Sequence, residues 1–192
     1  MKRSLGRKTL VTPVPVWTVG TYDTAGKANI MAAAWVGICC SRPPAVCVAL
    51  REATHTHRAI VEREAFTVNL PTVDQAILVD YIGSASGNDV DKFAVAGLTA
   101  EKANGVDAPI VTEFPVNVEC RLIHTLKIGL HTLFVGEILD VQADDDVLDE
   151  NGHLSIEKLH PFVFATSEPA YYAIGERIGA AFEIGRALAD AR

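Results

Sequence analysis

Two long stretches near the middle of the chain have the pattern of β-strands, and they constrain the fold more than any other feature. In residues 115–128 apolar and polar side chains alternate, so one face holds Val116, Val118, Cys120 and Leu122 and the other Asn117, Glu119 and Arg121. Residues 129–143 are apolar on both faces, which is typical of a central strand. We therefore expect two long strands, the second as a central strand of a sheet.

Shorter strand patterns occupy much of the rest of the chain. They cover residues 13–22, 28–40, 45–51, 66–71 and 160–165. The turn sequence DTAGK between the first two predicts a hairpin. About six strands with a few helices predict a mainly β fold, a closed and mostly antiparallel β-barrel with peripheral helices.

Helical patterns lie between these strands. They cover residues 54–65, 75–86, 87–97 and 176–191, with Thr54 or Thr56 as the N-cap of the first and Asp74 as the N-cap of the second. Gly97 ends the third, residues 107–115 read as a connector, and residues 144–153 form a polar turn.

Composition narrows the class of protein. A length of 192 residues suits a single domain, 1–192. The net charge of −7 opposes non-specific binding to nucleic acid or to an anionic membrane. Without an apolar run near the roughly 18–20 residues of a membrane span and without a signal-peptide pattern, we expect a cytoplasmic protein.

The four cysteines predict free thiols. Cys39 and Cys40 are adjacent, Cys47 and Cys120 are apart, and the chain contains no CxxC motif. We expect mostly buried, structural thiols in a reducing compartment, with Cys39 and Cys40 taking no catalytic part.

The run NIMAAAWVGICC at residues 29–40 combines one large side chain with many small ones. A strand lined by Ala32, Ala33, Ala34 and Gly37 lets another group approach its backbone. A flat ring system suits this space, with backbone N–H groups near residues 33–41 as donors and Trp35 as a wall. Tight packing of strands at a barrel corner explains the same residues.

The stretch LREATHTHR joins a strand end to a helix start and predicts an anion site. Free N–H groups and the helix dipole meet there, and Arg51, Thr54 and Thr56 add a guanidinium and two hydroxyls, a set that suits a phosphate. Lys92 adds a point charge if it reaches the same place. An ordinary N-cap, a solvated arginine and an exposed lysine are the simpler interpretations.

The histidines leave other interpretations open. His55 and His57 form an HxH pair suited to a metal, but the spacing fixes no third ligand. His124 and His131 lie on apolar strand faces, where hydrogen-bonded core histidines are the usual case. The chain has no P-loop, GxGxxG, HExxH or nucleophile-elbow motif.

Several segments together resemble the flavin-reductase-like family of FMN-binding split barrels, and within it the flavoredoxin branch. The segments are PVWTVGTYD at 15–23, AAWVGICCS at 33–41, FTVNLP at 66–71, DVDKF at 89–93, GLHT at 129–132 and VLDENG at 147–152. The likeness covers almost the whole chain. It implies a six-stranded antiparallel split barrel, a homodimer and one FMN per subunit near the dimer interface.

The resemblance also implies roles for particular residues. Asn29 and Trp35 would contact the flavin, whose ring would lie beside residues 32–40. Backbone groups near Cys39, Cys40 and Ser41 would meet the polar edge of the ring. The phosphate would be held by Thr54, Thr56 and Lys92, with Arg51 nearby, and the pocket would be closed by His131 and Phe164, in part from the neighbouring subunit.

One departure from the family bears on the electron donor. Many flavin reductases of this family carry Gly-Asp-His, with a histidine associated with nicotinamide, where this chain has Gly129-Leu130-His131. The resemblance therefore favours an FMN electron carrier, reduced by a protein redox partner or by NAD(P)H. An NAD(P)H-dependent flavin reductase that supplies an oxygenase, and a non-redox flavin- or haem-binding module, are the alternatives.

Overall fold

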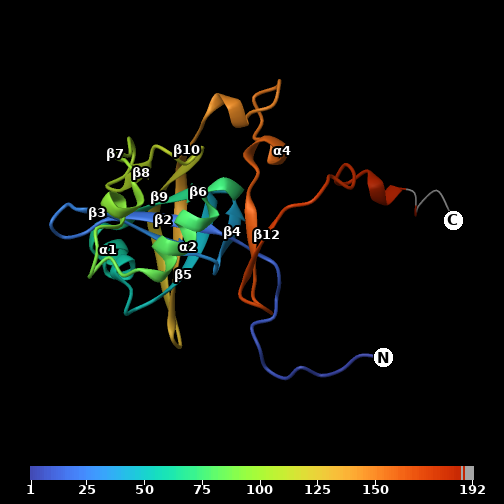
Figure 1. The fold of residues 1–192 in the computed structure, drawn as a ribbon, viewed down its shortest axis with the longest axis horizontal. Coiled ribbons are helices and arrows are strands. Elements are labelled where there is room, and N and C mark those ends of the chain that lie inside the picture. Colours follow the sequence, from blue (N-terminus) through green and yellow to red (C-terminus); the bar gives the residue numbers. More distant parts are fainter. Residues whose placement is uncertain (187, 189–192) are drawn as a thin grey trace.

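A seven-stranded antiparallel sheet dominates the computed structural model, which describes residues 1–186 and residue 188 (Figure 1). Its strand order is β3-β2-β6-β9-β10-β5-β4. In chain order the strands are β2 (Trp17–Tyr22), β3 (Ala28–Ala33), β4 (Val36–Ser41), β5 (Pro44–Arg51), β6 (Ala65–Leu70), β9 (Val116–Ile128) and β10 (His131–Ala143). The expected mainly β class is confirmed, with more strands than the six expected.

Two small sheets and several helices complete the fold. The sheets consist of β1 (Val14–Pro15), β11 (Phe162–Ala165) and β12 (Ala170–Ala173), and of β7 (Ala100–Lys102) and β8 (Pro109–Val111). The helices are α1 (His55–Arg63), α2 (Ala76–Ser84), α3 (Lys92–Ala96) and α4 (Ile156–Leu159), with 3₁₀ turns at η1 (Val73–Gln75), η2 (Asp145–Val147) and η3 (Ile184–Arg186).

The two long strands form a hairpin. Ile128 pairs with His131 across a two-residue turn in which Gly129 has φ 52°. A positive φ at the first turn position favours glycine, which explains this residue. β10 also pairs with β5, which confirms its central place in the sheet.

The polar face of β9 differs from the usual solvent-facing pattern. Asn117 and Glu119 are buried, and the Glu119 carboxylate accepts hydrogen bonds from the backbone N–H of Asn104 (3.0 Å) and Gly105 (2.5 Å) and from Nε2 of Gln142 (2.7 Å). A buried carboxylate needs such donors. The alternating pattern gives no sign that a distant loop covers this face.

Two groups of buried side chains form the core. One fills the inside of the large sheet around Val19, Phe66 and Phe134. The other lies between β3 and α2 around Ile30 and Ile82. This second group fixes α2 against β3, the strand that contains the run of small residues.

Several boundary predictions were wrong. The second helical segment begins through a capping box between Thr72 and Gln75, not through Asp74. Residues 107–115 contain β8, and β12 follows the strand expected to be last. These strands are three or four residues long, too short for a periodic pattern.

The expected C-terminal helix over 176–191 is not formed over residues 176–186. Residues 174–180 have no regular structure, and η3 is a single 3₁₀ turn. Residues 187 and 189–191 of that prediction lie outside the described residues. The first residues of the chain and residues 174–186 extend away from the sheet (Figure 1). Within residues 1–186 and 188, no helix is long and apolar enough to cross a membrane.

Candidate functional site

The run of small residues lines a cavity of about 290 Å³, which we call the small-residue cavity. It lies between β3, the C-terminal half of α2, and strands β11 and β12, and its lining consists of Val16, Ala32, Ala33, Ala34, Asp80, Gly83, Ser84, Phe164 and Tyr171. A Cβ at Gly83 would lie 3.0 Å from Cβ of Ala32. The glycine at position 83 therefore lets α2 approach β3 closely. The small side chains of Ala33 and Ala34 leave the space of the cavity open.

A second cavity, of about 220 Å³, adjoins the first at Gly83 and Ser84 and is here called the polar cavity. It is lined by Met31, by residues 53–56 at the start of α1, by residues 83–87 and by Lys92. Among these described lining residues, Lys92 is the one lysine or arginine and no carboxylate is present. The adjoining cavities together match the size of small-molecule sites.

The start of α1 presents hydrogen-bond donors to the polar cavity. The Thr54 hydroxyl donates to the backbone oxygen of Arg51 (2.8 Å) and caps the helix by accepting from the N–H of His57. The Thr56 hydroxyl accepts from Nδ2 of Asn29 (2.9 Å), which leaves its own proton to donate. Backbone N–H groups of the first helical turn have no acceptor within the helix. The interpretation of Thr54 as an N-cap is thus confirmed, and Thr56 is the freer donor.

Lys92 is buried, contrary to the simpler expectation of an exposed lysine. It is 5 % exposed, and its Nζ donates to the backbone oxygen of Ile82 (2.7 Å). Burial lowers its pKa from 10.5 to about 8. The Nζ group has three donors, and an anion in the polar cavity would stabilise its charged form.

Asn29 is buried beside these groups. Its amide holds the Thr56 hydroxyl, and a Cβ at Gly87 would collide with its side chain. The glycine lets the chain between α2 and α3 close over Asn29. Asn29 therefore lies beside the polar cavity and orients one of its donors.

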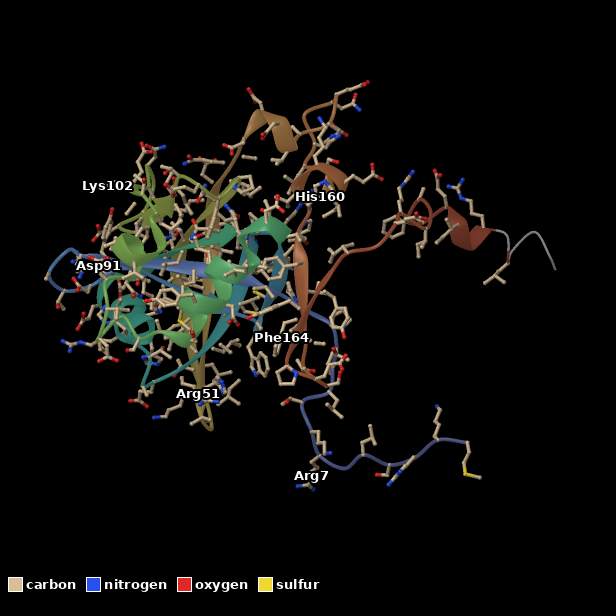
Figure 2. The ribbon with its side chains drawn as sticks, viewed as in Figure 1. Arg7, Arg51, Asp91, Lys102, His160 and Phe164 are labelled. Atoms are coloured by element: carbon tan, nitrogen blue, oxygen red, sulfur yellow. The ribbon has the colours of Figure 1, made fainter. Side chains whose placement is uncertain are left out.

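Phe164, from β11 (Figure 2), lines the small-residue cavity. Trp35 lies on the other side of Ala34, 40 % exposed, in an apolar depression of about 400 Å³ that also includes Val36 and Leu133. Ala34 thus lines both the small-residue cavity and this apolar depression.

Arg51 and His131 are absent from the lining of both cavities. They are register partners across β5 and β10 beside the hairpin tip, where Arg51 is exposed (Figure 2) and His131 is half-buried. The Arg51 backbone oxygen accepts from the Thr54 hydroxyl at the start of α1, but Arg51 does not line the polar cavity with Thr56 and Lys92.

The prediction that Cys39 and Cys40 are buried was wrong. With Ser41 they lie exposed on β4, an edge strand, and all four cysteines are free. Partial desolvation, followed by the neighbouring Cys47 thiol, raises the pKa of Cys39. Cys120 is buried, which raises its pKa to about 12. Apolar neighbours in the sequence did not indicate that β4 ends the sheet.

His55 and His57 do not converge. Nδ1 of His55 pairs with Oδ1 of Asn88 (2.8 Å), and Nε2 of His57 pairs with Oγ1 of Thr132 (2.8 Å). Within the part of the chain that the structure describes, no group of three potential ligands is placed to hold a metal ion.

Sequence reasoning missed two polar residues of the small-residue cavity. The Tyr171 hydroxyl donates to Oδ1 of Asp80 (3.0 Å), and burial followed by this carboxylate raises the pKa of Tyr171 to about 12. In the sequence, Asp80 fits the polar face of a helix and shows no sign of a further role. Tyr171 belongs to strand β12, which was not predicted. No motif connects the two positions, which are far apart in the chain.

Comparison with known proteins gives the family. The model of the flavin reductase like domain matches residues 8–173, most of the chain. This protein belongs to that family. A structure of flavoredoxin from Desulfovibrio vulgaris (Miyazaki F) is 49% identical, with a TM-score of 0.92, over 96% of this chain and 100% of that one.

Two further relatives are informative. A flavoredoxin structure from Methanosarcina acetivorans is 30% identical with a TM-score of 0.92, covering 98% of this chain and 99% of that chain. The reductase component of a 4-nitrophenol 4-monooxygenase/4-nitrocatechol 2-monooxygenase from Rhodococcus opacus is 32% identical over 54% of this chain and 52% of its own length. The chain thus spans about half of that relative.

Proposed function

We propose that this protein is an FMN-binding redox protein of the flavoredoxin type. The adjoining cavities carry the proposal, because one is mostly apolar with several small residues in its lining and the other offers a lysine, a free hydroxyl and a helix N-terminus. This division fits a molecule with a flat ring at one end and a phosphate at the other. When bound, FMN supplies hydride and single-electron transfer, and the protein supplies orientation and electrostatics.

The polar cavity binds the phosphate in this proposal. The donors are the Thr56 hydroxyl, the first-turn N–H groups of α1 and Nζ of Lys92, while Thr54 shapes the helix start. Asn29 orients the Thr56 hydroxyl, which donates to the phosphate. Arg51, exposed at the end of β5, approaches the phosphate only if its side chain turns toward α1.

The small-residue cavity receives the ring. Ala32, Ala33 and Ala34 give one wall, and Phe164 gives another. Trp35 does not line this cavity itself, but it follows Ala34, which does. Backbone groups near Cys39, Cys40 and Ser41 and the side chain of His131 meet the ring from a second copy, since one chain leaves them outside the cavity.

A homodimer follows from that assignment. The exposed side chains of β4 and of the β9–β10 hairpin include Ile38 (78 % exposed), Leu126, Ile128 and Leu130 (65 %). In the sheet β5 separates β4 from the hairpin, and several large apolar side chains exposed on such strands are typical of an interaction surface. A second copy would cover them and bring its own residues to the ring.

The test of the function is the state of the purified protein. We expect a yellow protein whose denaturation releases FMN rather than FAD, and an apoprotein that takes up added FMN with one site per chain. Absorption spectroscopy and chromatography of the released flavin measure both. A colourless protein that takes up no FMN would contradict the proposal.

A second candidate function is an NAD(P)H-dependent flavin reductase that supplies an oxygenase. The similarity to the reductase component from Rhodococcus opacus favours it. Leu130, 65 % exposed in the hairpin turn, speaks against it, because it replaces the aspartate of the reductase motif. Steady-state NADH and NADPH oxidation distinguishes the two: turnover near ~10 s⁻¹, an ordinary enzyme rate, would support the reductase.

A further inference from the structure

Asp80 and Tyr171 bring a negative charge to the wall of the small-residue cavity. Asp80 comes from α2 and Tyr171 from β12, and the hydroxyl of Tyr171 donates to Oδ1 of Asp80 at 3.0 Å. Among the nine described residues that line this cavity, Asp80 is the one carboxylic acid, and none is a lysine, arginine or histidine.

The Tyr171 ring is held by its neighbours. It meets Phe162 edge-on at 5.4 Å between ring centroids and lies 5.7 Å from Phe164. Phe164 itself lines the cavity. The hydroxyl is therefore positioned by aromatic packing, and it keeps the Asp80 carboxylate directed toward β12.

The C-terminal end of α2 is a second source of negative potential at this cavity. α2 ends at Ser84, which also lines the cavity. The C-terminal end of a helix carries a partial negative charge. The carboxylate and the helix end together make the cavity unfavourable for a ligand that gains negative charge.

We propose that the Asp80–Tyr171 pair makes the ring site bind oxidised FMN more tightly than reduced FMN, and so lowers the reduction potential of the bound flavin. The inference rests on the proposed function. Reduction adds electrons to the ring, and a fixed carboxylate beside it opposes that added charge. The pair is a positioning and charge element, and it accepts no electron itself.

The test measures the dissociation constant of oxidised FMN by fluorescence and the midpoint potential of bound FMN by dye equilibration. We expect Asp80→Asn to reduce the preference for oxidised over reduced FMN about tenfold, which equals about 30 mV for a two-electron couple. Tyr171→Phe keeps the carboxylate, so its shift should be less than half of that. Asp74→Asn, which removes an exposed carboxylate just before α2, should leave the potential unchanged.

The possible failures are distinct. Normal FMN binding with an unchanged potential in Asp80→Asn would overturn the charge assignment and leave the proposed function intact. An equal shift in Tyr171→Phe and Asp80→Asn would also overturn it, because packing would then explain the effect. A wild-type protein that binds no FMN would overturn the proposed function and this inference with it.

Discussion

At the residue scale, Lys92 is the side chain whose burial most needs a ligand. An ammonium group that is 5 % exposed and bonded to one backbone oxygen still has donors to satisfy. We expect Lys92→Met to weaken FMN binding at least tenfold, because a charge-assisted hydrogen bond contributes about 1.5–3 kcal/mol. Riboflavin, which lacks the phosphate, should bind almost unchanged. Fluorescence titration with both ligands measures the difference.

The matched control for this prediction is Lys102→Met. Lys102 is exposed on β7, and its substitution should affect neither ligand (Figure 2). Equal losses for FMN and riboflavin in Lys92→Met would place the phosphate elsewhere.

The lowered pKa of Lys92 also predicts a pH dependence. Burial lowers that pKa to about 8, and the phosphate interacts with the charged form. FMN affinity should therefore fall as the pH rises above about 8, by up to about tenfold per pH unit. The apoprotein behaves oppositely. Between about pH 8 and 10.5 its unfolded state binds more protons at this group, so its stability rises with pH.

Binding measurements from pH 7 to 9.5 check the affinity. Lys92→Met should abolish the slope for FMN, and riboflavin should show none in either protein. A flat FMN profile for the wild-type protein would refute the role of Lys92 as the charge on the phosphate.

At the scale of elements, α2 contacts β3 at Gly83, and Gly83 lines both cavities. A Cβ at Gly83 would lie 3.0 Å from Cβ of Ala32, so Gly83→Ala must move one element by a few tenths of an ångström. Overpacking costs about 1–3 kcal/mol, but alanine in place of glycine in a helix returns about 1 kcal/mol. We expect a change in unfolding free energy below about 2 kcal/mol and FMN binding weakened about fivefold or more.

Chemical denaturation and FMN titration separate these two effects. Gly175→Ala, which meets open space just after β12, is the control and should change neither. Unaltered FMN affinity in Gly83→Ala would show that this junction does not contact the cofactor.

The same scale shows what the sequence can predict. β9 and β10 are long enough for their side-chain pattern to be clear, and Thr54 marks the start of α1 through its capping bond. The buried Glu119 was not predictable, because its donors come from Asn104 and Gly105 in a distant loop.

The candidate site likewise contains residues that the sequence predicts and residues that it does not. Thr56 and Lys92 stand in motifs and do meet at one cavity. Asp80 and Tyr171 meet only through the packing of β12 beside α2, which no local pattern encodes.

At the scale of the whole molecule, FMN binding and assembly should be linked. The exposed apolar side chains of β4 and the hairpin leave one chain incomplete, and the proposed ring site takes residues from both copies. A ligand that binds only the assembled state stabilises it by about 2.7 kcal/mol at a hundredfold excess over its dissociation constant. We therefore expect a homodimer whose melting temperature rises with added FMN.

The variant that tests this link carries Ile38→Asp and Ile128→Asp, two charges on the exposed apolar surface. It should sediment as a monomer, bind FMN at least tenfold more weakly and lose most of the FMN-dependent rise in melting temperature, because burying an unpaired carboxylate costs several kcal/mol. Leu154→Asp, beyond the far end of β10, should remain a dimer with normal FMN affinity. A wild-type monomer that binds FMN fully would show that one chain completes the site. His131 and the backbone near Cys40 would then have no place at the ring.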